Sequence, residues 1–119
     1  MTSAYEQPTY GGVQALRDAL EKDDPEVLGP MIIAAALYEE DFDVVDKACV
    51  QLSSHPDEIV RGNAILVFGH LARLFGRLGD EAPGLVKKAL LDTSEYVRGQ
   101  AYAAAGDLRH FLGIETSEQ

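Results

Sequence analysis

The chain has 119 residues, of which 46% are hydrophobic and 25% are charged, a composition typical of one folded domain. Its formal net charge is -10, which argues against nucleic acids and anionic membranes as partners. No apolar run reaches the length of a membrane span, and the N-terminal sequence MTSAYEQPTY lacks the basic and apolar regions of a signal peptide. We therefore expect a cytoplasmic protein.

Apolar residues recur with a helical period along the chain, and no segment shows the alternation of a strand. The sequence predicts an all-α fold with a flexible lead-in at residues 1–9, one domain over 10–113 and a frayed tail over 114–119. Helix starts are indicated by capping residues such as Asp24, which precedes Pro25, and Asp80, which precedes Pro83. The predicted helices span residues 11–22, 25–38, 42–53, 57–75, 80–91 and 94–112.

Two of these helices are copies of one sequence, 37 positions apart. Residues 58–76, EIVRGNAILVFGHLARLFG, and 95–113, EYVRGQAYAAAGDLRHFLG, are identical at eight of nineteen positions. A period of this size predicts a helical solenoid. Each copy also has glycines seven residues apart, although glycine costs about 1 kcal/mol relative to alanine inside a helix. We therefore expect a neighbouring helix to pack too closely for a Cβ at Gly62, Gly69, Gly99 and Gly106.

The Val-Arg-Gly start of each copy, preceded by SHPDE or DTSE, resembles the second helix of a HEAT repeat. The resemblance implies an α-solenoid of about three helical hairpins, with six antiparallel helices. In that family the arginine joins a ladder of polar contacts with acids of the inter-helix turns. The ladder residues implied here are Arg61, Arg98 and Asp92, and this role is favoured over binding of an anionic ligand. His55 takes the place of Asp92 in the earlier copy, so an irregular ladder is expected there.

Patterns that support catalysis are missing from the sequence. The histidines His55, His70 and His110 have no metal-ligand spacing, and no glycine loop suited to phosphate follows a strand. The one cysteine, Cys49, lies on an apolar helix face, which favours a buried thiol over a nucleophile. We predict no enzymatic activity, no cofactor and no metal.

The excess of negative charge is confined to the first half of the chain. Residues 1–58 hold thirteen Asp and Glu against three Lys and Arg, whereas residues 59–119 hold seven of each kind. A solenoid keeps sequence neighbours together, so one end should be acidic. The densest cluster lies beside Tyr38 and Phe42 and comprises Glu39, Glu40, Asp41, Asp43 and Asp46. It is either a solvated face in which Asp41 or Asp43 caps a helix, or a docking surface for a basic protein.

Two functional classes fit these patterns. The chain resembles the small HEAT-like immunity proteins that bacteria pair with toxin domains in contact-dependent growth inhibition systems. This resemblance implies a non-catalytic inhibitor that binds a basic toxin, for example a nuclease, through the acidic cluster and Tyr38. The alternative is a scaffold that holds a partner on its inner surface, for which the candidates are Asn63, His70, Gln100, Tyr102 and Asp107. HEAT-like nucleic-acid enzymes and pigment lyases fit less well, because the chain is short and its charge has the wrong sign for nucleic acid.

Overall fold

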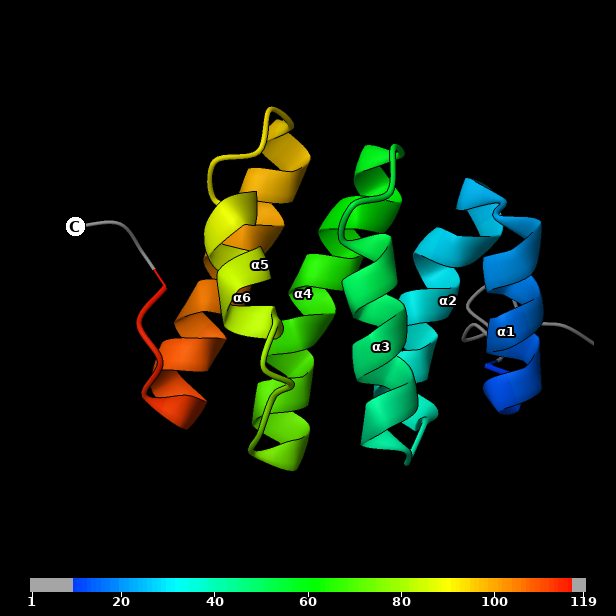
Figure 1. The fold of residues 1–119 in the computed structure, drawn as a ribbon, viewed down its shortest axis with the longest axis horizontal. Coiled ribbons are helices and arrows are strands. Elements are labelled where there is room, and N and C mark those ends of the chain that lie inside the picture. The colour runs from blue at the N-terminus through cyan, green and yellow to red at the C-terminus, as the bar shows by residue number, and fades with distance from the viewer. Residues whose placement is uncertain (1–9, 117–119) are drawn as a thin grey trace, which may run out of the picture.

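A computed structural model describes residues 10–116 and shows six α-helices and no strand over that range. Consecutive helices run in alternating directions (Figure 1). The predicted all-α class is confirmed, and the expected lead-in at residues 1–9 lies outside the described range. The helices are α1 (Gly12–Lys22), α2 (Pro25–Tyr38), α3 (Phe42–Leu52), α4 (Glu58–Phe75), α5 (Ala82–Ala89) and α6 (Glu95–Leu112).

Capping residues fix most of these helix boundaries. Asp24, Asp41 and Asp57 lie before α2, α3 and α4, and each carboxylate accepts hydrogen bonds from backbone N–H groups of the first turn. At the other end, Gly76 and Gly113 follow α4 and α6 with a positive φ of 67°, the left-handed conformation that closes a helix. The predicted boundaries are therefore correct to within two residues at every helix end.

The start of α5 differs from the prediction. Asp80 does not cap the helix, which begins at Ala82 and has Glu81 at its N-cap without a side-chain hydrogen bond. Pro83 explains the shift, because its ring suits the first turn of a helix and its missing N–H needs no partner there. Asp80 is left outside the helix, in the connection from α4.

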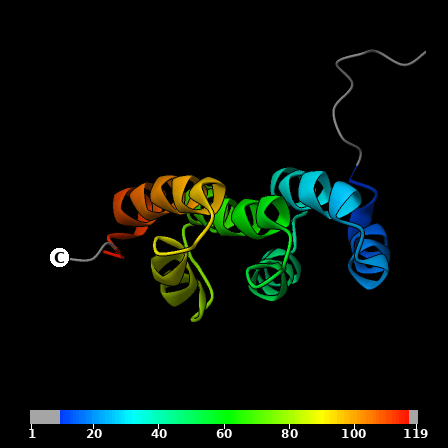
Figure 2. The ribbon, with the colours of Figure 1, turned by 90° about the horizontal axis from the view of Figure 1, so that it is seen from above.

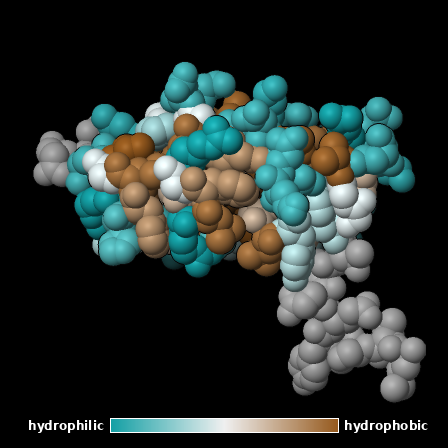
Figure 3. Space-filling model, turned by 90° about the horizontal axis from the view of Figure 1, so that it is seen from below, coloured by the Kyte–Doolittle hydropathy of each residue, from teal (hydrophilic) through white to brown (hydrophobic). Residues whose placement is uncertain are grey.

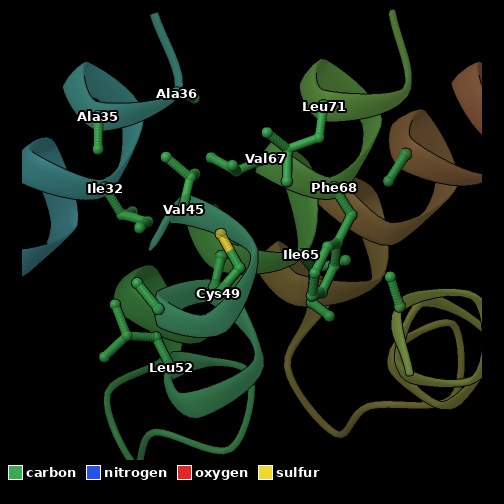
Figure 4. Packing of buried hydrophobic residues seen from close by; sticks show 14 of the residues in the cluster. Ile32, Ala35, Ala36, Val45, Cys49, Leu52, Ile65, Val67, Phe68 and Leu71 are labelled. Carbon is green, nitrogen blue, oxygen red and sulfur yellow. The ribbon is translucent and has the colours of Figure 1, made fainter. Parts of the chain in front are cut away.

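The helices form two layers, with α2, α4 and α6 in one layer and α1, α3 and α5 in the other (Figure 2). The molecule measures 50 × 29 × 27 Å, and α4 lies in its middle, packed against α2, α3, α5 and α6. The core joins both layers: Ile32 of α2, Val45 and Cys49 of α3, and Ile65 and Phe68 of α4 are all buried (Figure 4). Among the described helices, none is both long and apolar enough to cross a membrane.

The segment after α6 packs back on the domain. Ile114 N donates a hydrogen bond to the carbonyl of Leu108 at 3.2 Å, and its side chain is half-buried against the core. Thr116 is buried as well. Ile114 and Thr116 therefore lie against the domain, because Gly113 turns the chain back toward the apolar residues of α6. Residues 117–119 of the expected tail lie outside the described range.

Candidate protein-binding surfaces

An arginine side chain links two of the turns between helices. Arg61 donates from Nε and Nη2 to the two oxygens of Asp92, at 2.9 and 2.8 Å, and from Nη1 to the carbonyls of His55 and Pro56. The hydrogen bond from Arg61 lowers the pKa of Asp92 below its ordinary value. One guanidinium thus joins the α3–α4 turn to the α5–α6 turn.

The ladder ends at α6. Arg98 repeats the two carbonyl contacts of Arg61, donating to Asp92 and Thr93 at 2.8 and 3.1 Å. No carboxylate within residues 10–116 hydrogen-bonds with Arg98, whereas Asp92 pairs with Arg61. Arg98 therefore holds its own turn but joins no further unit in the described chain.

The α3–α4 turn is also linked to the turn before it. In this link the turn residue of α3–α4 donates the hydrogen bond, whereas Asp92 accepts one. His55, at the place of Asp92, contacts Asp23 of the α1–α2 turn, with Nε2 and Oδ1 2.6 Å apart. The other ring nitrogen, Nδ1, accepts from Asp57 N at 2.9 Å, so Nε2 carries the hydrogen and donates to Asp23. The expected irregularity at His55 is present, but a turn-to-turn link exists there too.

Three of the five carboxylates in the acidic cluster accept hydrogen bonds within the protein. Glu39 accepts from Tyr10 Oη at 2.7 Å and from Asp41 N at 2.9 Å, and the bond from Tyr10 lowers the pKa of Glu39. Burial and the neighbouring Glu39 raise the pKa of Tyr10. Asp41 is the N-cap of α3. Asp46 is half-buried and accepts from Gly79 N at 3.4 Å, and burial raises its pKa above the ordinary value.

The other two carboxylates of the cluster have different surroundings. Glu40 and Asp43 are exposed, and their side chains accept no hydrogen bond from residues 10–116. Next to them in the chain, Leu37 and Tyr38 are 51% and 53% exposed at the end of α2. We call these four residues, Leu37, Tyr38, Glu40 and Asp43, the acidic corner. Apolar side chains also reach the surface on the side of the molecule where α2, α4 and α6 end (Figure 3).

Phe42 is not a surface anchor, although the sequence placed it beside the acidic cluster. Its side chain is buried, and its ring meets Phe75 edge-on with centroids 5.5 Å apart. The guanidinium carbon of Arg77 lies 4.2 Å from the Phe42 ring centroid. The aromatic ring therefore packs the start of α3 against the end of α4.

A groove adjoins the acidic corner. This cavity between α1 and α3 has a volume of about 340 Å³ and contains apolar side chains, two acids and two cations. Its lining residues are Leu16, Arg17, Leu20, Asp41, Asp43, Val44, Lys47, Ala48 and Gln51. The groove can therefore receive an apolar side chain next to the free carboxylate of Asp43.

Of the predicted inner-surface residues, Asn63 and Gln100 belong to one hydrogen-bonded group. Asn63 is 8% exposed; its Nδ2 donates to the Gly29 carbonyl at 3.0 Å, and its Oδ1 accepts from Tyr96 Oη at 2.5 Å and from Gln100 Nε2 at 3.4 Å. One amide thus joins α2, α4 and α6. Tyr96 was not among the predicted residues, although its position one turn before Gln100 on the repeated helix could have indicated it.

Of the remaining inner-surface candidates, Asp107 and His70 lie near each other where α6 packs on α4, and Tyr102 lies elsewhere. Asp107 contacts α4, since a Cβ added at Gly69 would lie 3.2 Å from its Cβ. His70 is half-buried beside Arg73, whose Nη2 lies 2.8 Å from Nδ1, and burial lowers the pKa of His70. Tyr102 is 79% exposed and lies about 200° around α6 from Gln100, on a different side of the helix. Tyr102 therefore does not share a surface with the other four predicted residues.

The described residues also show how the other reactive groups are placed. Cys49 is buried as expected, and burial raises the pKa of its thiol well above the ordinary value. Within residues 10–116, no three His, Cys, Asp or Glu side chains gather in a way that could hold a metal ion. In the comparisons with known proteins, no family model, no curated protein and no solved structure matches this chain.

Proposed function

We propose that this chain is a HEAT-like α-solenoid of three helical hairpins that acts as a non-catalytic inhibitor of a basic protein, most simply a toxin domain. The hairpins are α1–α2, α3–α4 and α5–α6. Support for the solenoid comes from the alternating helices in two layers, the 37-residue repeat and the Arg61–Asp92 link between turns.

The observation that carries the functional proposal is the acidic corner. It combines two exposed apolar side chains, Leu37 and Tyr38, with two exposed carboxylates that have no partner in the described chain, Glu40 and Asp43. Tyrosine is enriched among residues that dominate binding energy, and carboxylates without partners suit lysine or arginine of the bound protein. The remaining negative charge of residues 1–58 would speed the approach of a basic partner.

The proposed site is smaller than the cluster that the sequence indicated. Because Glu39, Asp41 and Asp46 accept hydrogen bonds within the chain, their replacement would disturb the fold as well as binding. The binding residues are therefore Tyr38, Glu40 and Asp43 with Leu37, and the groove between α1 and α3 extends the contact surface.

The test is co-expression with the product of the adjacent gene, followed by calorimetry of the purified pair. We expect binding, and we expect Glu40→Gln with Asp43→Asn to weaken it roughly tenfold or more at low salt. Tyr38→Ala should weaken it at all salt concentrations, since its contribution is apolar. The matched control is Glu21→Gln with Glu26→Gln, which removes the same charge from exposed positions on α1 and α2.

Each outcome separates the alternatives. If the control variant loses as much affinity as the acidic-corner variant, total charge and not this site governs binding. If the neighbouring gene product does not bind at all, the inhibitor function is wrong and the scaffold alternative takes its place. Binding of duplex DNA or RNA at physiological salt would contradict the proposal of a purely protein partner.

A further inference from the structure

One side of α6 is uncovered where the same side of α4 is buried. The α4 residues Gly62, Ile65 and Gly69 face α6: Ile65 is 1% exposed, and a Cβ added at Gly69 would lie 3.1 Å from the Cα of Ala104. Their equivalents on α6, 37 positions later, are Gly99, Tyr102 and Gly106. There Tyr102 is exposed, and a Cβ added at either glycine would meet nothing within 4 Å.

The uncovered side of α6 carries opposite charges at its two ends. At about 100° per residue, one stripe is formed by residues that follow one another at intervals of four or three, namely Glu95, Gly99, Tyr102, Gly106 and Arg109. Glu95 and Arg109 are both exposed, and each lies seven residues from Tyr102. Arg109 Nη1 is 4.0 Å from Glu115 Oε1, an exposed contact too weak to hold the guanidinium away from a partner. We call the five stripe residues the α6 stripe.

We propose that a second copy of this chain covers the α6 stripe, with the two α6 helices antiparallel across a twofold axis at Tyr102. In such a pair, a residue before Tyr102 in one chain faces the residue of the second copy that lies equally many positions after Tyr102. This reciprocity is the rule for a twofold interface. Glu95 then faces Arg109 of the second copy, and this ion pair occurs twice. Gly99, three residues before Tyr102, and Gly106, four residues after it, come within one residue of facing each other and permit the backbones to approach. The two Tyr102 rings pack at the centre.

The charge distribution favours this end of the molecule for self-association. Two chains with a net charge of -10 repel one another, but residues 59–119 hold seven charges of each sign. The α6 end lies opposite the α1 end (Figure 1), so contact through α6 keeps the two acidic halves far apart. The acidic corner remains free in the dimer, and the dimer does not depend on the proposed inhibitor function.

The interface is small, because it is built on a single helix face, and the dimer should dissociate on dilution. Sedimentation velocity of the full chain over a concentration series up to the millimolar range measures this directly. We expect the wild type to shift from monomer to dimer as concentration rises.

A charge exchange tests the register. Glu95→Arg alone and Arg109→Glu alone each place like charges opposite one another twice, so both variants should stay monomeric. An equimolar mixture of the two variants should dimerise again, because the introduced arginine of one chain then faces the introduced glutamate of the other, and both native charges also pair. Glu21→Arg, with the same charge change on α1, should dimerise like the wild type, and circular dichroism should show every variant folded.

Three results would overturn the proposal. The first is a wild type that stays monomeric over the whole series. The second is a dimer that is unaffected by Glu95→Arg, which would place the interface elsewhere. The third is a mixture of the two variants that stays monomeric although both are folded.

Discussion

Helices α4 and α6 share a sequence pattern but have different neighbours. The difference shows how the position of a helix in the molecule sets the contacts of its residues. In α4, Gly69 is covered by α6 and Arg61 reaches the carboxylate of the next turn. In α6, the equivalent Gly106 is open, and the described chain offers Arg98 only carbonyl oxygens. The same residue is therefore a packing or linking residue only where a neighbouring helix is present.

The largest expected effect is from a charge placed at a buried position in the first turn of α4. Val60 and its equivalent Val97 are both fully buried. Val60→Asp should lower the free energy of unfolding by about 3–5 kcal/mol or prevent folding, because it buries an unpaired charge. Val97→Asp should cost less, since the end helix can shift toward solvent. Urea unfolding of both variants measures this, and a nearly neutral Val60→Asp would show that α4 is not central.

Replacing the two equivalent glycines by alanine should have opposite effects on stability. Gly69→Ala should destabilise by about 1–3 kcal/mol, because the methyl group meets the Ala104 backbone and Asp107 across the contact. Gly106→Ala should stabilise by roughly 0.5–1 kcal/mol, because the site is open and alanine is the better helix former. Thermal unfolding compares the two. Equal effects in one direction would mean that the two helices have equivalent surroundings.

Removing the equivalent arginines should likewise cost more stability in α4 than in α6. Arg61→Ala should cost about 2 kcal/mol, because it leaves the half-buried Asp92 without its partner. Arg98→Ala should cost at most about 1 kcal/mol, since two exposed carbonyl contacts are lost. Denaturant midpoints of the two variants test this difference, and an Arg98→Ala cost as large as that of Arg61→Ala would contradict it.

The stability difference between the wild type and Arg61→Ala should depend on pH. The pKa of Asp92 is lowered in the folded state, so its contribution is fully present above the unfolded pKa, near 4, and is lost as pH falls through the folded value. The wild type should therefore lose its advantage over Arg61→Ala in acid. The advantage over Arg98→Ala should change less.

The smallest expected effect is at Asp46, where the acidic cluster meets the core. Burial raises the pKa of Asp46, so keeping it ionised at neutral pH works against folding. Asp46→Asn keeps an oxygen for Gly79 N and should stabilise at neutral pH by less than about 0.5 kcal/mol. The gain should vanish below the ordinary aspartate pKa, where the wild-type side chain is protonated in both states. A loss of stability at pH 7 would contradict this account.

The helices themselves were predictable from the sequence, because local signals decide them. Asp24, Asp57 and the glycines that follow α4 and α6 fix boundaries through contacts within a few residues. The repeat also identified Gly62 and Gly69 as sites of close approach. The same expectation is wrong for Gly99 and Gly106, since a repeated pattern does not show which copy lies at the end.

The candidate site was predictable only in outline. The sequence located the acidic segment, but Glu39 is held by Tyr10, 29 residues earlier, and Asp46 by Gly79, 33 residues later. Such partners are set by tertiary packing and leave no local signal. For the same reason, nothing near Phe42 in the sequence shows that Phe75 and Arg77 cover its ring.

Position in the molecule, and not the shared sequence pattern, sets the environment of the two repeated helices. Native-state hydrogen exchange followed by NMR tests it most directly, using backbone amides in the middle of α4 and the equivalent amides of α6. Because α4 packs against four other helices and α6 lies at an end, α4 amides should exchange only by global unfolding. The α6 amides should exchange faster, through opening of the end hairpin. Equal protection of the two helices, or stronger protection of α6 in the monomer, would contradict the claim.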